Sequence, residues 1–277
     1  MKKILTIQDI SCVGKCSLTV ALPIISAMGV EAGILPTAVL STHTMFQNFQ
    51  VKDLTDTVTP FSAHWKAENI AFDALYTGYL GSFEQIDLMK KLFADFKTAD
   101  NFTFVDPAMA DNGKLYPAFD ENFAKYMATL CAQADIIVPN ITEACFMTGA
   151  EFKTHYDEAY VKDLLLRLSA LGTKLCLITG VSFEENSTGI MGYDSETKEF
   201  YYYKHVRLPV SFHGTGDIFS STCVGALVRG YRWQEAIQIA GDYTAECIRI
   251  TLEDPSKPWY GVNFEQAIPY LVKRLEK

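Results

Sequence analysis

A glycine turn followed by a carboxylate is the strongest chemical signal in this sequence, since Gly214-Thr215-Gly216-Asp217 leads into an apolar, helix-like run. The glycines let the backbone bend closely around a ligand, and the first N–H groups of a helix present partial positive charge to an anion. A carboxylate beside an anion would repel it, so Asp217 either handles a proton or serves as a helix cap or first-turn residue. The turn predicts an anion site with a base beside it, and a cap is the structural alternative.

Further polar side chains follow strand-like segments of the chain. In open α/β sheets ligands bind at the carboxyl ends of the strands, so these positions carry the most weight as site candidates. They are Asp9, Tyr79, Asp106, Asp111, Asn140, Glu143 and Thr179. If the glycine turn packs over the same edge of the sheet, Asp217 belongs with them.

The acidic members of this set have both structural and functional interpretations. Asn140 and Glu143 have the spacing of a capping box, in which the asparagine caps a helix and the glutamate reaches back. The same pair can instead face a nucleotide phosphate and its hydrated Mg²⁺, because hard cations take oxygen ligands. Asp106 and Asp111 are either solvated turn carboxylates or a pair whose charge a cation offsets.

Three other features of the sequence do not support a site. Val13-Gly14-Lys15-Cys16-Ser17 resembles the end of a P-loop, but Asp9 stands where the first glycine should be, and Cys16 follows the lysine. The seven cysteines are scattered with no CxxC pair, which is typical of buried thiols in a reducing cytoplasm. The five histidines show no zinc-ligand spacing.

Composition narrows the class of protein. With 277 residues, 49% of them hydrophobic, the chain can bury a sizeable core, and we expect a single domain over residues 1–277. The net charge of -9 argues against nucleic acid as a partner. The start of the chain lacks the long apolar stretch that is typical of a signal peptide, and the sequence has no uninterrupted apolar run of about eighteen residues, so we expect a cytoplasmic protein without a membrane span.

The elements that must position these residues alternate between strand and helix. The predicted strands are Ile4–Gln8, Gly33–Val39, Ala74–Tyr79, Phe102–Asp106, Ile136–Pro139, Leu175–Gly180, Gly189–Tyr193 and Glu199–Val206. The predicted helices are Ser17–Met28, Phe83–Phe96, Asp120–Leu130, Glu158–Leu171, Asp217–Arg229, Gln234–Thr251 and Asn263–Glu276. This pattern predicts an α/β fold, with helices on both faces of a mostly parallel sheet and a small antiparallel hairpin at its edge.

Taken in order, several motifs resemble the ribokinase superfamily, and within it the pyridoxal kinases most closely. The motifs are Ile7-Gln8-Asp9, Ser41-Thr42-His43-Thr44, Thr77-Gly78-Tyr79-Leu80-Gly81-Ser82, Asp106-Pro107, Pro139-Asn140-Ile141-Thr142-Glu143-Ala144 and Gly214-Thr215-Gly216-Asp217. The resemblance runs from Ile4 to about Arg229. It implies a three-layer α/β/α ribokinase-like fold, and a homodimer.

The resemblance also implies an activity, the transfer of the γ-phosphoryl group of ATP to the 5′-hydroxymethyl group of pyridoxal, pyridoxine or pyridoxamine. Such transfers depend on positioning and electrostatics. By similarity Asp217 is the base and the N–H groups of Gly214, Thr215 and Gly216 form the anion hole. The remaining implied roles are ATP binding by Asn140, Glu143 and Thr179, Mg²⁺ binding by Asp106, Asp111 and Glu143, and substrate binding by Asp9, Thr44, Tyr79 and His213. A monovalent cation such as K⁺ is a further candidate cofactor.

Three positions depart from the pyridoxal kinase pattern. Asp9 replaces a serine, and it pairs with a protonated ring nitrogen, with the amine of pyridoxamine, or with its own loop. Val138 replaces a threonine often found before Pro-Asn, which removes a hydroxyl that could contact the nucleotide. His213 precedes the glycine turn as in hydroxymethylpyrimidine kinases, although those carry Cys where this chain has Asp217. Hydroxymethylpyrimidine is therefore the alternative substrate, and a non-catalytic vitamin- or nucleotide-binding protein is the alternative class.

Overall fold

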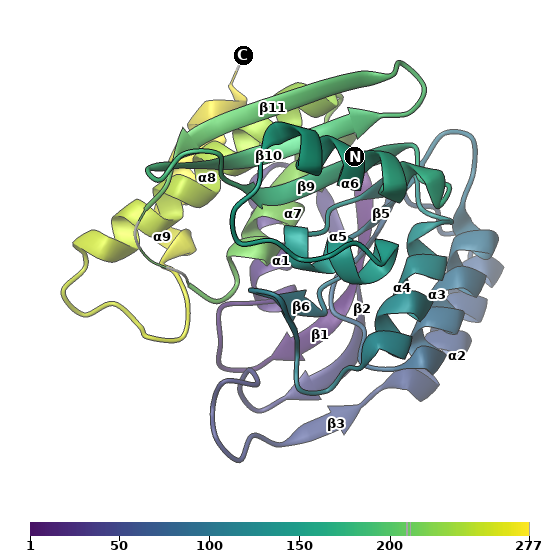
Figure 1. The fold of residues 1–277 in the computed structure, drawn as a ribbon. Helices are drawn as coiled ribbons and strands as arrows, with labels where there is room; N and C mark the ends of the chain where they lie inside the picture. The colour runs from purple at the N-terminus through teal and green to yellow at the C-terminus, as the bar shows by residue number, and fades with distance from the viewer. Residues whose placement is uncertain (209, 211, 277) are drawn as a thin grey trace. The chain divides into compact units, whose positions relative to one another are not determined.

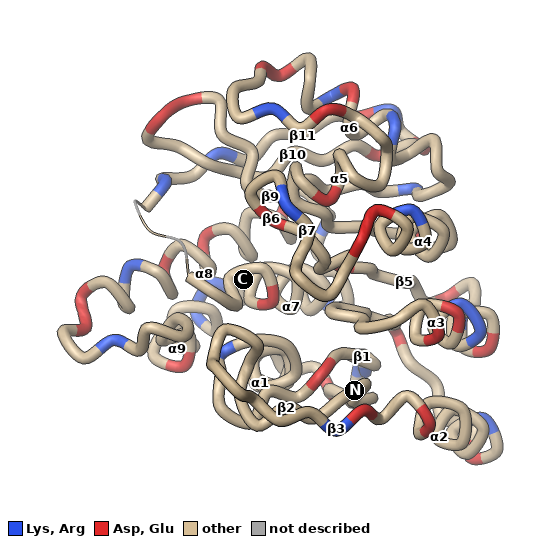
Figure 2. Tube along the Cα trace, turned by 60° about the horizontal axis from the view of Figure 1, so that its bottom comes forward, with Lys and Arg blue, Asp and Glu red and all other residues tan. Residues whose placement is uncertain are grey.

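The computed structural model describes residues 1–208, 210 and 212–276, and the chain divides into two compact units. Unit 1 comprises Met1–Tyr76 and His205–Lys277, and unit 2 comprises Thr77–Lys204. A single domain over residues 1–277 stays a prediction. Within the described residues, no helix has the length and apolar character that spanning a bilayer requires. Figure 2 shows lysines and arginines interspersed with acidic residues along the chain.

Unit 1 has the strand order β4-β1-β2-β3, in which β1 and β2 are parallel and β3 is antiparallel to β2. Its strands are β1 (Lys3–Ser11), β2 (Glu31–Leu40), β3 (Val51–Asp53) and β4 (Ala74–Thr77, whose last residue belongs to unit 2). Its helices are α1 (Leu18–Ala27), α2 (Thr55–Ala67), α7 (Thr215–Val228), α8 (Trp233–Glu253) and α9 (Phe264–Leu275). Helix α1 packs against β1 and α7, and α8 packs against α7 and α9 (Figure 1). Ile4, Leu5 and Ile7 of β1 are fully buried, as expected of a strand covered on both faces.

Unit 2 has the strand order β11-β10-β9-β8-β5, in which β5, β8 and β9 are parallel and β10 is antiparallel to β9 (Figure 1). Its strands are β5 (Phe102–Val105), β6 (Ala110–Asp111), β7 (Lys114–Leu115), β8 (Ile136–Ile137), β9 (Leu175–Val181), β10 (Ser187–Asp194) and β11 (Glu199–Val206, whose last two residues belong to unit 1). Its helices are α3 (Phe83–Phe96), α4 (Glu121–Cys131), α5 (Ile141–Thr148) and α6 (Glu158–Ala170). The strands β6 and β7 form a separate small antiparallel pair.

The predicted α/β class, with a mostly parallel sheet and an antiparallel edge, is confirmed. Helix α3 has the predicted bounds, because the Ser82 hydroxyl caps it at Gln85 N and its apolar residues follow the helical period. Strand β11 also has its predicted bounds, and the turn before it is closed by the Asp194 carboxylate, which accepts from Glu196 N and Thr197 N.

Several boundaries differ from the sequence-based expectation. Strand β1 continues to Ser11, so Asp9 lies within it rather than after it. Helix α7 begins at Thr215, which places Asp217 in its first turn instead of at its first residue. Helix α2 was not predicted, because it contains Pro60 and Val58 is its only buried residue among those described.

Candidate active site

The glycine turn of unit 1 forms the N-terminus of α7. Gly214 is the N-cap and adopts a left-handed φ of 83°, and a Cβ there would overlap the carbonyl oxygen of Lys15. Its own carbonyl accepts from Ile218 N at 3.1 Å, which starts the helix. Gly216 differs, because among the described residues no atom beyond its chain neighbours and the backbone of its own helix lies within 4 Å of the position of a Cβ. Gly214 is thus required for packing, whereas Gly216 leaves open space beside the first N–H groups of α7, which have no intrahelical acceptor.

Asp9 lies at an irregularity in β1. The pairing register of β1 with β2 shifts between Gln8 and Ile10, and such bulges re-aim the side chain at the irregular position. The carboxylate is only 5% exposed and accepts from Ser17 Oγ at 2.6 Å and from Ser11 Oγ at 3.2 Å. Burial raises the pKa of Asp9, while the two serine hydroxyls oppose the shift.

Two histidine rings lie beside each other near this carboxylate. The ring centroids of His43 and His213 are 4.6 Å apart, and His43 is close enough to Asp9 for the carboxylate to favour its charged form. His43 Nδ1 accepts from Met45 N at 3.2 Å, and its Nε2 lies 3.1 Å from the carbonyl oxygen of Tyr260. This arrangement fits the neutral tautomer with the proton on Nε2.

Burial also lowers the pKa of both rings. For His213 the value falls to about 4, first through burial and then through the proximity of His43. For His43 burial likewise dominates, against the opposing effects of the Tyr260 carbonyl and Asp9. Both rings are therefore uncharged near neutral pH. Thr44, the next predicted substrate contact, is exposed in the turn that follows His43.

In unit 2 the carboxyl ends of three neighbouring parallel strands bring predicted site residues together. Asp106 follows β5, Asn140 follows β8, and Thr179 lies near the end of β9, where it forms a parallel bridge with Asn140. The bridge includes Thr179 N donating to the Pro139 carbonyl at 3.0 Å. Adjacent parallel strands explain the grouping, because their carboxyl ends share one edge of the sheet.

Glu143 joins this group as the third residue of α5. The predicted capping box is confirmed, since Asn140 Oδ1 accepts from Glu143 N at 2.9 Å and Glu143 Oε2 accepts from Asn140 N at 2.8 Å. Glu143 Oε1 also accepts from Met109 N at 3.0 Å and Ala110 N at 3.4 Å. The glutamate therefore fastens the loop after β5 to the start of α5.

The electrostatics of Glu143 go beyond those of an ordinary cap. Its side chain is buried, and burial followed by the negative charge of Asp106 raises its pKa well above the usual value. Two buried carboxyl groups this close repel each other when both are ionised, and a hydrated divalent cation relieves that repulsion. The pair therefore fits a hydrated Mg²⁺ held by oxygen ligands.

The other two predicted contacts of unit 2, Asp111 and Tyr79, have more exposed surroundings than this pair. Asp111 is exposed, and its carboxylate accepts from the backbone and side-chain nitrogens of the adjacent Asn112. Among the described residues, no cluster of three or more His, Cys, Asp or Glu side chains could hold a metal ion. Tyr79 is half-buried, and its ring centroid lies 5.5 Å from that of Phe119.

Sequence reasoning missed the contribution of Ser17. Ser17 is the N-cap residue of α1, yet it forms no capping hydrogen bond and adopts φ 52° and ψ -136°. Its hydroxyl instead donates to Asp9. A serine before a helix-like run is the usual signal for a cap, so the sequence offered no indication of this contact.

Comparison with known proteins identifies the family. The phosphomethylpyrimidine kinase family model matches residues 22–258. A pyridoxal kinase from Dictyostelium discoideum is 26% identical over 243 residues, which cover 82% of this chain and 78% of that relative.

Solved structures extend the likeness over nearly the whole chain. A candidate phosphomethylpyrimidine kinase from Bacteroides thetaiotaomicron, in an orthorhombic form with pyridoxal, has a TM-score of 0.92 and 36% identity, covering 98% of this chain and 95% of that one. Pyridoxal kinase from Lactobacillus plantarum has a TM-score of 0.89 and 29% identity, covering 99% and 97%. These matches confirm the resemblance to pyridoxal kinases, and the chain belongs to the phosphomethylpyrimidine kinase family.

Proposed function

We propose that this chain is a vitamin B6 kinase, which transfers the γ-phosphoryl group of ATP to the 5′-hydroxymethyl group of pyridoxal, pyridoxine or pyridoxamine. The likeness to the B. thetaiotaomicron structure with pyridoxal carries the proposal, because it extends over 98% of this chain at 36% identity. The kinase relatives and the anion-binding geometry at the N-terminus of α7 support the same chemistry.

In this mechanism Asp217 is the base. Its carboxylate accepts the proton of the 5′-hydroxyl as that oxygen forms a bond to the γ-phosphorus, while the bond from the γ-phosphorus to the bridging oxygen breaks and ADP leaves. The N–H groups at the start of α7 stabilise the charge on the transferred group, with Gly214, Thr215 and Gly216 shaping the turn. A positioned base typically contributes about 10²- to 10⁴-fold to such a step.

The nucleotide side of the mechanism is assigned to unit 2. Asn140 and Thr179 are next to each other at the ends of β8 and β9, and we assign them to the phosphates of ATP. Asp106 and Glu143 would hold a hydrated Mg²⁺, which neutralises phosphate charge when bound. Asp111 as a metal ligand and K⁺ as a second cation remain predictions, as do a homodimer and a cytoplasmic location.

On the substrate side we assign Asp9, Thr44, Tyr79 and His213. The half-buried ring of Tyr79 offers a face for packing against the pyridine. The neutral imidazole of His213 can form hydrogen bonds without adding charge beside the transferred phosphate. The His-Gly-Thr-Gly run and the name of the matched family favour hydroxymethylpyrimidine as the second candidate substrate.

A substrate panel tests the proposal. ATP-dependent phosphorylation is measured for the three B6 vitamers and for hydroxymethylpyrimidine, over a range of Mg²⁺ and K⁺ concentrations. We expect kcat/KM to be highest for a B6 vitamer. Rapid turnover of the pyrimidine with no B6 turnover would overturn the assignment. Ligand-induced thermal shifts without any product would indicate a binding protein instead.

A further inference from the structure

The buried carboxylate of Asp9 has a setting that calls for a positive partner from outside the protein. Its two side-chain hydrogen-bond partners, Ser11 and Ser17, are neutral hydroxyls, one on each carboxylate oxygen. No lysine or arginine forms a salt bridge with Asp9 among the described residues. A buried carboxylate is costly unless it is paired. The two oxygens have about four acceptor positions, which are not filled by the two serine hydroxyls and the backbone hydrogen bond at Asp9 itself.

The titratable groups around Asp9 do not provide that partner. Burial lowers the pKa of His43 and keeps its ring neutral, and its Nδ1 is occupied as an acceptor from Met45 N. The thiol of Cys16 lies close to both Asp9 and Asp217, and burial followed by the charge of Asp217 raises its pKa to about 12. The thiol is therefore protonated and neutral. The negative charges of Asp9 and Asp217 both act on this thiol and raise its pKa.

Ser17 provides an independent reason to regard the orientation of Asp9 as functional. A non-glycine residue at φ 52° and ψ -136° is strained, and such strain persists where the surroundings impose it, often at functional sites. The strained backbone turns the Ser17 hydroxyl away from the helix end it would normally cap and toward Asp9, at 2.6 Å. The orientation of this carboxylate therefore coincides with a strained backbone at Ser17 and with the loss of a side-chain cap on α1.

On the basis of the B6 kinase function proposed above, we infer that Asp9 is a specificity-determining residue that binds the protonated ring nitrogen of the substrate. A 3-hydroxypyridine ring transfers its hydroxyl proton to the ring nitrogen and presents N–H⁺ near neutral pH. This group is common to all three vitamers, whereas the amine is found only in pyridoxamine. An aminopyrimidine is a weaker base and stays neutral, so Asp9 selects the pyridine ring by its charge.

The test separates ring charge from ring shape. Pyridoxine is compared with its carbocyclic counterpart, in which CH replaces the ring nitrogen, on the wild type, Asp9→Asn and Asp56→Asn. Asp56 is an exposed acid of unit 1 and provides the matched control. We expect Asp9→Asn to raise the KM for pyridoxine by about 10- to 100-fold, the range of a lost charge-assisted hydrogen bond, with a much smaller change in kcat. Binding of the carbocycle, measured as competitive inhibition, should not weaken.

A second pair of variants applies if Asp9→Asn does not fold. Ser17→Ala and Ser17→Gly both remove the hydroxyl that orients Asp9, and we expect the KM for pyridoxine to rise by about 3- to 10-fold in each. Ser17→Gly should also melt at a higher temperature than Ser17→Ala, because glycine relieves the strained backbone.

The outcomes are distinguishable from failure of the proposed function. If the wild type does not phosphorylate pyridoxine, the B6 kinase proposal fails. If the wild type is active but Asp9→Asn weakens the binding of pyridoxine and of the carbocycle equally, Asp9 does not recognise the ring charge and the inference is wrong. An unchanged KM in Asp9→Asn, or in both Ser17 variants, contradicts it as well.

Discussion

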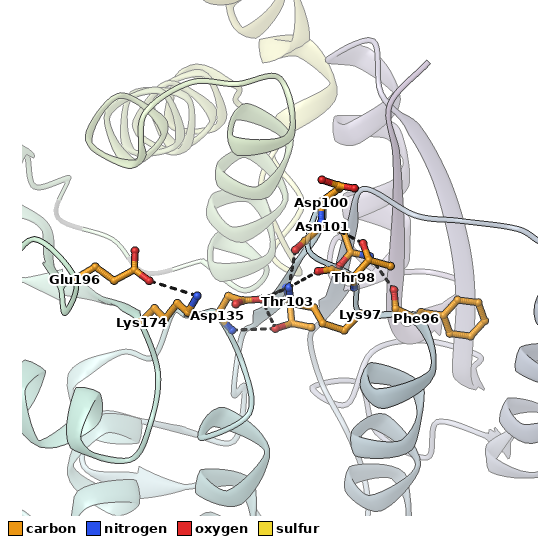
Figure 3. Close-up of polar contacts among 9 residues, drawn as sticks. All are labelled: Phe96, Lys97, Thr98, Asp100, Asn101, Thr103, Asp135, Lys174 and Glu196. Atoms are coloured by element: carbon orange, nitrogen blue, oxygen red, sulfur yellow. Dashed lines mark hydrogen bonds and ion pairs between the residues drawn. The ribbon is translucent and has the colours of Figure 1, made fainter.

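The two ends of the parallel strands in unit 2 carry carboxylates in opposite settings. At the amino ends, Asp135 precedes β8 and its Oδ2 accepts from Thr103 N at 2.9 Å and Thr103 Oγ1 at 3.0 Å, with Lys97 Nζ at 3.4 Å (Figure 3). Lys174, just before β9, forms an ion pair with Glu196 at 3.3 Å. At the carboxyl ends, Glu143 is held by backbone N–H groups beside another acid, Asp106.

This difference separates carboxylates that serve stability from carboxylates that can bind a cation. The amino-end carboxylate has a cation and hydrogen-bond donors supplied by the protein, so its interactions are complete within the fold. Glu143 has donors but a like-charged neighbour, so binding a cation there gains free energy that folding alone does not provide. Asp9 in unit 1 has the same character, with two hydroxyl donors and no salt bridge among the described residues. Among the described residues, Glu143 and Asp9 thus differ from Asp135 in having no salt bridge to a lysine or arginine.

The largest effect is expected at Asp217. Asp217→Asn keeps the size of the side chain but removes the proton acceptor, so kcat should fall by about 10²- to 10⁴-fold while the Kd for ATP changes little. Steady-state kinetics and ATP titration measure the two quantities. A kcat close to that of the wild type would show that Asp217 is a first-turn residue of α7 and no more.

The next effect concerns the cation at the carboxyl ends. Glu143→Gln removes one of the two neighbouring charges, so we expect the Mg²⁺ concentration for half-maximal activity to rise by about 10-fold or more. Mg²⁺ titration of the kinase rate measures it. Asp135→Asn is the matched control from the other end of the strands and should leave the Mg²⁺ dependence unchanged. Equal Mg²⁺ dependence in Glu143→Gln and the wild type would show that Glu143 caps α5 and does not contribute to Mg²⁺ binding.

Asp135→Asn should instead act on stability. The substitution removes the charge that Lys97 and the two Thr103 donors share, so the free energy of unfolding should fall by about 1 to 2 kcal/mol. Urea unfolding followed by circular dichroism gives this value, and kcat and KM should match those of the wild type. A loss of activity at wild-type stability would break the contrast between the two ends.

Features of the fold and of the candidate site could be predicted from the sequence where neighbouring residues determine them. The bounds of α3 follow from Ser82 and a helical period, and the grouping of Asp106, Asn140 and Thr179 follows from their positions after adjacent strands. The contact between Ser17 and Asp9 could not be predicted, because a serine before a helix chooses between a cap and a tertiary partner according to the packed structure.

The ion pair between Lys97 and Asp135 could not be predicted from the sequence either. Lys97 and Asp135 are far apart in sequence, and only the packing of the strand ends brings them together. Helix α2 was missed for the opposite reason, since its local pattern is weak and Val58 is its only buried residue among those described. Local signals therefore predict elements and strand-end positions, whereas the charge balance that separates the two ends is tertiary.

The smallest effect extends the comparison to the histidines of unit 1. His213 lies against His43 with a pKa lowered to about 4, whereas His64 is exposed and 4.0 Å from Glu68. The unfolded chain binds a proton at His213 near pH 6.5, and the folded chain does not, so His213 makes stability fall as the pH drops below that value. At about pH 5 the loss should be on the order of 2 kcal/mol.

His213→Gln should remove that part of the pH dependence, and His64→Gln should not. Urea unfolding of both variants and the wild type at about pH 7 and pH 5 measures the slope that belongs to each ring. The free energy of unfolding of the His213 variant should change least between the two pH values. Glutamine does not bind a proton in either state, so unfolding no longer takes up a proton at this position. If all three lose the same free energy between these pH values, the ring at position 213 is protonated in the folded protein. His213 would then carry a charge in the folded protein, as Asp135 does, and would not be the neutral ring assigned to the substrate.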